Sequence, residues 1–107
     1  MNKTIDETYT LIQDNANNPD FIILDVRTPS EYASGYIENA VNIDYYADDF
    51  EDTLDQLDKS KTYLVYCRTG SRSASAMNIM KKLDFIEVYN MQGGITAWTS
   101  AEYPVVS

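Results

Sequence analysis

The sequence predicts an α/β fold in which helices cover both faces of a parallel sheet. Short apolar runs of strand length recur along the chain, at residues 21–24, 40–43, 63–66 and 86–89. Helical patterns lie between these runs, and such alternation is typical of a parallel sheet. With 107 residues, of which 44% are hydrophobic, the chain can bury one core without disulfides or metal ions. We therefore expect one domain that spans residues 1–107.

The N-terminal segment is expected to form a short edge strand followed by a helix. Residues 3–5 are predicted as the strand. Asp6 or Thr8 can cap a helix that runs to about Asp14, because the apolar side chains that follow recur at helical spacing. The Asn-rich stretch 15–20 contains a proline and is typical of a loop, so it ends this helix.

The next part of the chain predicts a buried strand and a short, well-capped helix. Residues 21–24 form a continuous apolar run, which suits a strand covered on both faces. Thr28 is the predicted N-cap of the helix, with Pro29 in the first helical position and Glu31 three residues after the cap. Gly35 is expected to end this helix.

The second half of the chain repeats the same alternation. Phe50, Leu54 and Leu57 form one apolar stripe on an otherwise acidic helix. Residues 63–66 form a strong apolar run of strand length, and residues 73–83 follow with helical spacing. After the strand at 86–89, a pair of glycines opens a final helix.

Composition excludes several classes of function. The net charge of −9 argues against nucleic acid or anionic membranes as partners. The chain has no histidine, which removes histidine metal sites and Cys–His dyads, and its single cysteine cannot form an internal disulfide. No apolar leader is present at the N-terminus, so we expect a cytoplasmic protein with a reduced thiol, without metal or cofactor.

Chemistry is concentrated in the loop that follows the strand at 63–66. Cys67 stands at the strand end, where α/β sheets bind ligands. The residues expected to form a substrate-binding loop are Arg68, Thr69, Gly70, Ser71 and Arg72. Such a loop can point backbone N–H groups at an anion, and the dipole of the next helix adds positive potential. Because no imidazole is available, this cradle and the two arginines are expected to lower the pKa of the thiol.

Four blocks of residues give the chain a resemblance to single-domain rhodanese sulfurtransferases over nearly its whole length. They are Leu24–Arg27, then Glu31-Tyr32 with Gly35–Ile37 and Ala40–Ile43, then Cys67–Arg72, and finally Gly93–Trp98. The resemblance implies five parallel strands flanked by helices. It also implies transfer of sulfur from thiosulfate, a persulfide or a polysulfide to cyanide or a thiol, with a protein thiol as one such acceptor.

The resemblance also suggests roles for individual residues. Cys67 would be the nucleophile that carries sulfur as a persulfide. Arg68 would hold the outer oxygens of a thiosulfate-like anion, whereas Arg72 would brace the loop or add positive potential. Asp25 and Arg27 are similar to family residues near the loop, and we interpret them as a structural ion pair that supports the site. The Gly93–Trp98 block is expected to serve packing.

The chain departs from the family pattern at several positions. Tyr36 stands where a histidine is common, Glu38-Asn39 where Pro-Gly is common, and Asp84 where glycine usually ends the helix after the loop. Aspartate tolerates the left-handed conformation that such a helix end requires. Thr69 stands where some members have a second cation, so we expect less efficient use of the dianion thiosulfate.

Two other functions compete with sulfur transfer. A phosphatase or arsenate reductase of related fold also uses a cysteine and an arginine, but its loop is one residue longer than the four residues between Cys67 and Arg72. The shorter loop leaves little room for a tetrahedral oxyanion over the sulfur. The second alternative is a non-enzymatic module that relays a persulfide or binds a protein. Such a module would use the acidic helix or a rim formed by Tyr36, Tyr45 and Tyr46. The acidic helix is also typical of an ordinary solvated surface, and the tyrosines are also typical of a core.

Overall fold

A parallel sheet of five strands forms the centre of the computed structural model, which describes all 107 residues. The strand order is β1-β5-β4-β2-β3, and every neighbouring pair is parallel. The strands are β1 (Asn2–Lys3), β2 (Phe21–Asp25), β3 (Val41–Asn42), β4 (Thr62–Tyr66) and β5 (Glu87–Met91). The helices are α1 (Ile5–Asp14), α2 (Pro29–Ala33), α3 (Phe50–Asp55), α4 (Ser71–Lys82) and α5 (Gly94–Ser100). The predicted α/β class and parallel sheet are confirmed.

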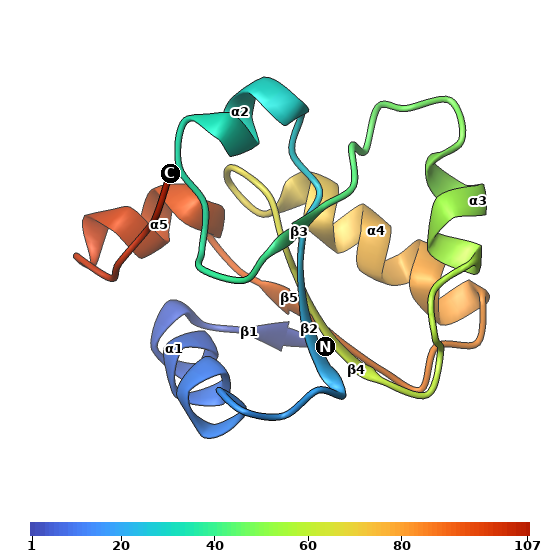
Figure 1. Cartoon of the computed structure of the whole chain (residues 1–107), viewed down its shortest axis with the longest axis horizontal. Helices are drawn as coiled ribbons and strands as arrows, with labels where there is room; N and C mark the ends of the chain where they lie inside the picture. Colours follow the sequence, from blue (N-terminus) through green and yellow to red (C-terminus); the bar gives the residue numbers. More distant parts are fainter.

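Helices cover both faces of the sheet (Figure 1), with α3 and α4 on one side and α1 and α5 on the other. The position of β4 in the middle of the sheet explains the unbroken apolar run at residues 63–66. Tyr63 and Val65 pack toward α3 and α4, whereas Leu64 and Tyr66 pack toward α1 and α5. Because successive side chains of a strand point to opposite faces, a strand covered on both sides needs an unbroken apolar run.

The start of α1 differs from the prediction. The N-cap is Thr4, not Asp6 or Thr8, and the edge strand already ends at Lys3. The Glu7 N–H donates to Thr4 Oγ1 at 3.2 Å, and the Thr4 N–H donates to the Glu7 carboxylate at 2.9 Å. This capping box satisfies two N–H groups at once, so it outweighs a cap further along the chain.

The start of α2 matches the prediction. The Glu31 N–H donates to Thr28 Oγ1 at 3.3 Å, and the Thr28 N–H donates to the Glu31 carboxylate at 3.0 Å. Pro29 occupies the first turn, where its missing N–H costs nothing. The helix ends before Gly35, whose φ of +146° few other residues adopt.

Other element boundaries shift by one or two residues. The last strand begins at Glu87 because Ile86 lies in the preceding turn with 76% of its surface exposed. Helix α4 begins at Ser71, two residues earlier than predicted, because Gly70 turns the chain with a φ of +109°. Asp84 has the expected left-handed conformation, with a φ of +70°. Residues 56 and 57 lie beyond the end of α3, although Leu57 still packs against the core.

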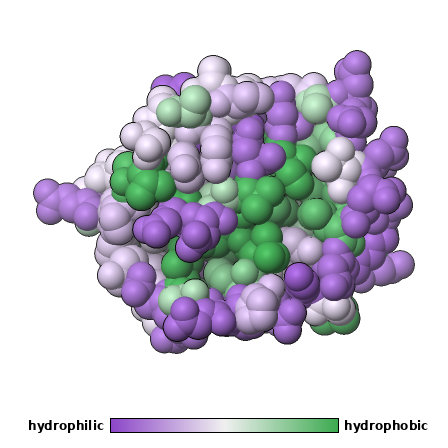
Figure 2. Space-filling view, in the orientation of Figure 1, coloured by the Kyte–Doolittle hydropathy of each residue, from purple (hydrophilic) through white to green (hydrophobic).

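The exposed side chains are mixed in character. Figure 2 shows apolar side chains in the middle of one face, over the sheet edge where β3 lies, with polar side chains around them. Val41 of β3 is 48% exposed at this edge. None of the helices has the length and apolar character needed to cross a membrane.

Candidate active site

The loop that carries Cys67 lies at the carboxyl end of β4, between that strand and α4. Tyr66, the last residue of β4, pairs in register with Asp25, the last residue of β2, so the ends of both strands meet at this edge. Cys67 is buried, with 1% of its surface exposed, whereas the next two loop residues are exposed. The thiol therefore lies at the base of the loop, with the polar residues above it.

Hydrogen bonds hold the sulfur of Cys67. The Gly70 N–H donates to Cys67 Sγ at 3.1 Å, and the Ser73 hydroxyl lies 3.4 Å from the same sulfur. Burial raises the pKa of the Cys67 thiol, but hydrogen bonds from the Ser73 hydroxyl and from the backbone of Ser73, Gly70 and Thr69 outweigh it, so the pKa is lowered overall. The sequence pointed to the cradle but not to Ser73, which reaches the thiol from the first turn of α4.

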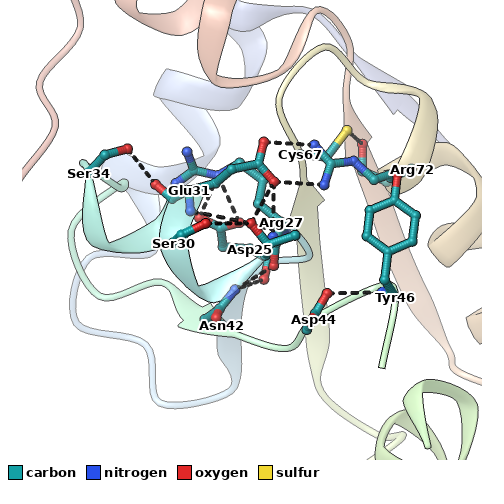
Figure 3. Close-up of polar contacts among 12 residues, drawn as sticks. Asp25, Arg27, Ser30, Glu31, Ser34, Asn42, Asp44, Tyr46, Cys67 and Arg72 are labelled. Carbon is teal, nitrogen blue, oxygen red and sulfur yellow. Dashed lines mark hydrogen bonds and ion pairs between the residues drawn. The ribbon is translucent and has the colours of Figure 1, made fainter. Parts of the chain in front are cut away.

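The two arginines of the loop have different surroundings. Arg72 forms a bidentate ion pair with Glu31, with nitrogen–oxygen distances of 2.9 and 3.0 Å. Figure 3 shows the Arg72 guanidinium facing the Glu31 carboxylate, with Cys67 and Tyr46 beside it. Arg68 is exposed and takes part in none of the ion pairs of the structure. The pair thus joins the first turn of α4 to α2.

The first residues of α5 form hydrogen bonds with the backbone of the Cys67 loop. The Ile95 N–H donates to the Cys67 carbonyl at 2.9 Å, and the Thr96 N–H donates to the Arg68 carbonyl at 3.1 Å. A Cβ on Gly94 would lie 2.3 Å from the Arg68 carbonyl oxygen, so only glycine permits this approach. Gly94 therefore packs against the backbone of the Cys67 loop, whereas a Cβ on Gly93 would lie 2.7 Å from the Cβ of Ala97.

Asp25 and Arg27 form a buried ion pair of 2.6 Å. The Arg27 guanidinium also donates to the Gly35 carbonyl at 2.6 Å and lies 5.7 Å from the centre of the Tyr66 ring. The Asn42 amide donates to the carbonyls of both Asp25 and Arg27. This network joins the end of β2 to the segment after α2, next to the residue that precedes Cys67.

The tyrosines divide between core and rim. Tyr46 is 64% exposed, and its ring centre lies 5.5 Å from the Arg72 guanidinium, so it lies at the rim of the site. Tyr45 packs edge-on against Phe50, 5.1 Å away. Tyr36, at the position where histidine is common in the family, stacks on the Tyr32 ring at 4.1 Å and pairs with the C-terminal segment. Of these three tyrosines, Tyr46 is the one whose ring lies against a residue of the Cys67 loop.

A separate hollow of about 650 Å³ lies between α1, the start of β2 and the C-terminal segment. Its apolar lining includes Tyr9, Ile12, Phe21 and Trp98, and no residue of the Cys67 loop reaches it.

No three cysteine, aspartate or glutamate side chains gather closely enough to hold a metal ion.

Comparisons with known proteins identify the family and agree with the fold. Residues 6–101 match the family described as "Rhodanese-like domain". A "Sulfurtransferase" of Allochromatium vinosum is 30% identical over 101 residues, covering 94% of this chain and 92% of that protein. The crystal structure of a rhodanese-related protein from Thermoplasma volcanium superposes with a TM-score of 0.83 at 30% identity, covering 98% of this chain and 96% of that one.

Some relatives are much longer than this chain. The "Probable adenylyltransferase/sulfurtransferase MoeZ" of Mycobacterium tuberculosis is 35% identical over 82 residues, which cover 77% of this chain and 21% of that protein. The chain thus corresponds to about a fifth of that relative, and to nearly all of the Allochromatium protein.

Proposed function

The chain belongs to the rhodanese-like domain family as a sulfurtransferase, and from its site we propose that it carries sulfur as a persulfide on Cys67. The observation that carries this proposal is the buried thiol whose sulfur accepts hydrogen bonds from Gly70 and Ser73. These donors favour the thiolate, which is the form of cysteine that attacks sulfur.

The proposed reaction has two half-reactions. In the first, the Cys67 thiolate attacks the outer sulfur of the donor, and the donor's S–S bond breaks. The leaving group departs with that electron pair, as sulfite from thiosulfate or as a thiolate from a persulfide or polysulfide. In the second, cyanide or an acceptor thiol attacks the outer sulfur of the Cys67 persulfide and releases the Cys67 thiolate. The backbone donors of the loop would stabilise the negative charge in both steps.

The donor would bind above the thiol, against the exposed part of the loop. Arg68 is free to contact an anion there, because no carboxylate of the protein pairs with it. Thr69, Gly70 and Ser71 would supply backbone and hydroxyl donors. Cyanide or a small thiol can serve as the sulfur acceptor. We propose a protein thiol as the acceptor in a reduced compartment such as the cytoplasm. The reaction requires no cofactor.

The competing functions have weaker support. A phosphatase needs a wider loop, yet α4 begins at Ser71, only four positions after Cys67. Gly70 donates directly to the sulfur, which leaves little space for a phosphoryl group in line with it. A purely structural module has no need for a thiol with a lowered pKa.

Intact-protein mass spectrometry tests the proposal. Reduced protein is mixed with excess thiosulfate, or in parallel with a polysulfide, and then desalted. We expect a mass increase of one sulfur atom on Cys67, the only cysteine, and a return to the original mass after cyanide, with release of thiocyanate. Cys67→Ser is the matched control, since it removes one nucleophile at nearly constant volume and should gain no sulfur. If neither donor loads a thiol that iodoacetamide can alkylate, the proposal is wrong. Faster hydrolysis of an aryl phosphate than sulfur uptake would favour the phosphatase instead.

A further inference from the structure

The ion pair between Glu31 and Arg72 affects more than the stability of the loop. Both terminal nitrogens of the Arg72 guanidinium are occupied by the two oxygens of Glu31, at 2.9 and 3.0 Å. The two side chains are only 15% and 26% exposed, so solvent screens the pair incompletely. The positive charge of Arg72 is therefore compensated before any donor arrives.

Glu31 is fixed in this position by the N-cap of α2. The Thr28 N–H and the Thr28 hydroxyl both donate to Glu31 Oε1, at 3.0 and 3.1 Å. Hydrogen bonding to Arg72, followed by that to Thr28, lowers the pKa of Glu31 to about 2 against the opposing effect of burial. The carboxylate thus keeps its charge at every pH at which the protein would work. The ring of Tyr46 covers a second side of the same guanidinium, 5.5 Å away.

This arrangement limits the charge that a donor can bring to the loop. Arg68 is the only loop cation without an ion-pair partner. Thiosulfate carries two negative charges toward a site that already holds the Cys67 thiolate and the Glu31 carboxylate. An alkyl persulfide carries one negative charge at most, so it meets less repulsion.

We propose that Glu31 is a specificity-determining residue, which directs the site toward persulfide donors of low charge and away from thiosulfate. The proposal rests on the sulfur transfer proposed above and specifies its donor. The step is the attack of the Cys67 thiolate on the outer sulfur of the persulfide R–S–SH. The thiolate electron pair forms the new S–S bond, and the old S–S bond pair leaves on the thiolate RS⁻. The proton of the donor stays on the outer sulfur, so charge and atoms balance.

The test compares rates of sulfur loading from two donors, read as the gain of one sulfur atom by intact mass. The donors are thiosulfate and the persulfide of 2-mercaptoethanol, which has no other charged group. Glu31→Gln removes the negative charge and keeps an acceptor for the Thr28 N–H. We expect loading from thiosulfate to rise by about tenfold and loading from the persulfide by less than about threefold.

Two further variants make the comparison decisive. Asp14→Asn is the charge-matched control, because Asp14 is an exposed residue of α1 on the other side of the sheet and makes no ion pair. Its loading rates should stay within about twofold of wild type for both donors, since distant surface charges are screened.

Thr69→Lys adds a cation on the exposed side of the loop and leaves the Glu31–Arg72 pair intact, so it should also favour thiosulfate. If Glu31→Gln fails to fold, an unchanged loading ratio in Thr69→Lys overturns the inference, because donor choice would then not respond to charge at the loop.

The outcomes separate this inference from the function on which it rests. An unchanged ratio of thiosulfate to persulfide loading in folded Glu31→Gln protein overturns the inference, whichever donor the wild-type protein prefers. An equal change in Asp14→Asn overturns it too, because the effect would then be one of net charge. If no donor loads Cys67 in any variant, the proposed function itself is wrong.

Discussion

Replacing Gly94 with alanine should disable the site by displacing the backbone of the Cys67 loop, without removing any side chain that we propose to meet a substrate. The new Cβ would lie 2.3 Å from the carbonyl oxygen of Arg68, 2.4 Å from its carbon and 2.6 Å from the Thr69 nitrogen. These are backbone atoms, which cannot rotate away as a side chain can. Ordinary contact begins at 3.4 Å, so the loop must withdraw by roughly 1 Å. Gly94 also has a φ of +62°, which is unfavourable for alanine.

The expected cost follows from these contacts. Left-handed strain contributes about 1–2 kcal/mol, and each of the two hydrogen bonds from Ile95 and Thr96 to the loop contributes about 1 kcal/mol if it is lost. We expect the free energy of unfolding to fall by about 2–4 kcal/mol and Tm by roughly 10–20 °C. A displacement of about 1 Å in the loop that surrounds the reacting sulfur should slow sulfur loading about 100-fold, measured under conditions in which the variant is still folded.

Gly35→Ala is the matched control for this experiment. Gly35 also has a positive φ, of +146°, but the nearest atoms to its new Cβ lie at 3.8 and 3.9 Å, which is ordinary contact. This variant should lose stability through backbone strain and keep its loading rate within about threefold of wild type. The reasoning is refuted if Gly94→Ala loads sulfur at the wild-type rate, or if Gly35→Ala loses as much activity.

Three further predictions concern the thiol and its charged neighbours. Ser73→Ala should raise the pKa of the Cys67 thiol, which would shift the pH profile of iodoacetamide alkylation to higher pH. In the wild-type protein, an inflection of this profile at or above about pH 8.5 would contradict the activation of the thiol. Arg68→Ala should raise KM for an anionic donor more than it lowers kcat, because the lost contact contributes roughly 1.5–3 kcal/mol to donor binding. Unchanged kinetics would mean that the donor binds elsewhere. Because the pKa of Glu31 is lowered to about 2, its ion pair stabilises the protein above the unfolded-state pKa of about 4.3 and loses this effect as the pH falls toward 2. The stability lost in Arg72→Ala, about 1–2 kcal/mol at pH 6, should therefore shrink over that range in acid unfolding curves, and a constant difference would argue against the ion pair.

Family membership and sulfur transfer agree with what the sequence indicated. The strand-end cysteine and its short loop were visible because the elements around them are encoded locally. An unbroken apolar run indicates a strand with two covered faces, and Thr28 followed by Glu31 indicates a helix start. The same local logic applied to Thr4 and Glu7 could have located the start of α1, where the prediction went wrong. That signal was present in the sequence.

Other features of the site depend on contacts between residues far apart in the chain. Glu31 was predicted only as a capping residue, yet it also pairs with Arg72, 41 positions away. Gly94 was expected to serve packing, but only the folded chain identifies its neighbour as the backbone of the Cys67 loop.

The pKa of the Cys67 thiol likewise depends partly on the local sequence and partly on contacts that form only in the folded chain. The loop sequence suggested a thiol activated by a cradle of backbone N–H groups and by two arginines. In the structure one of the arginines is already paired, and the sulfur accepts hydrogen bonds from the Gly70 N–H and the Ser73 hydroxyl. Residue spacing determined which elements form and where the cysteine lies among them, because hydrogen bonding and periodicity act over a few residues. Which charges remain free at the site was decided only by the tertiary structure, which brings Glu31 of α2 within reach of Arg72 of α4. An ion pair between residues so far apart leaves no pattern along the chain.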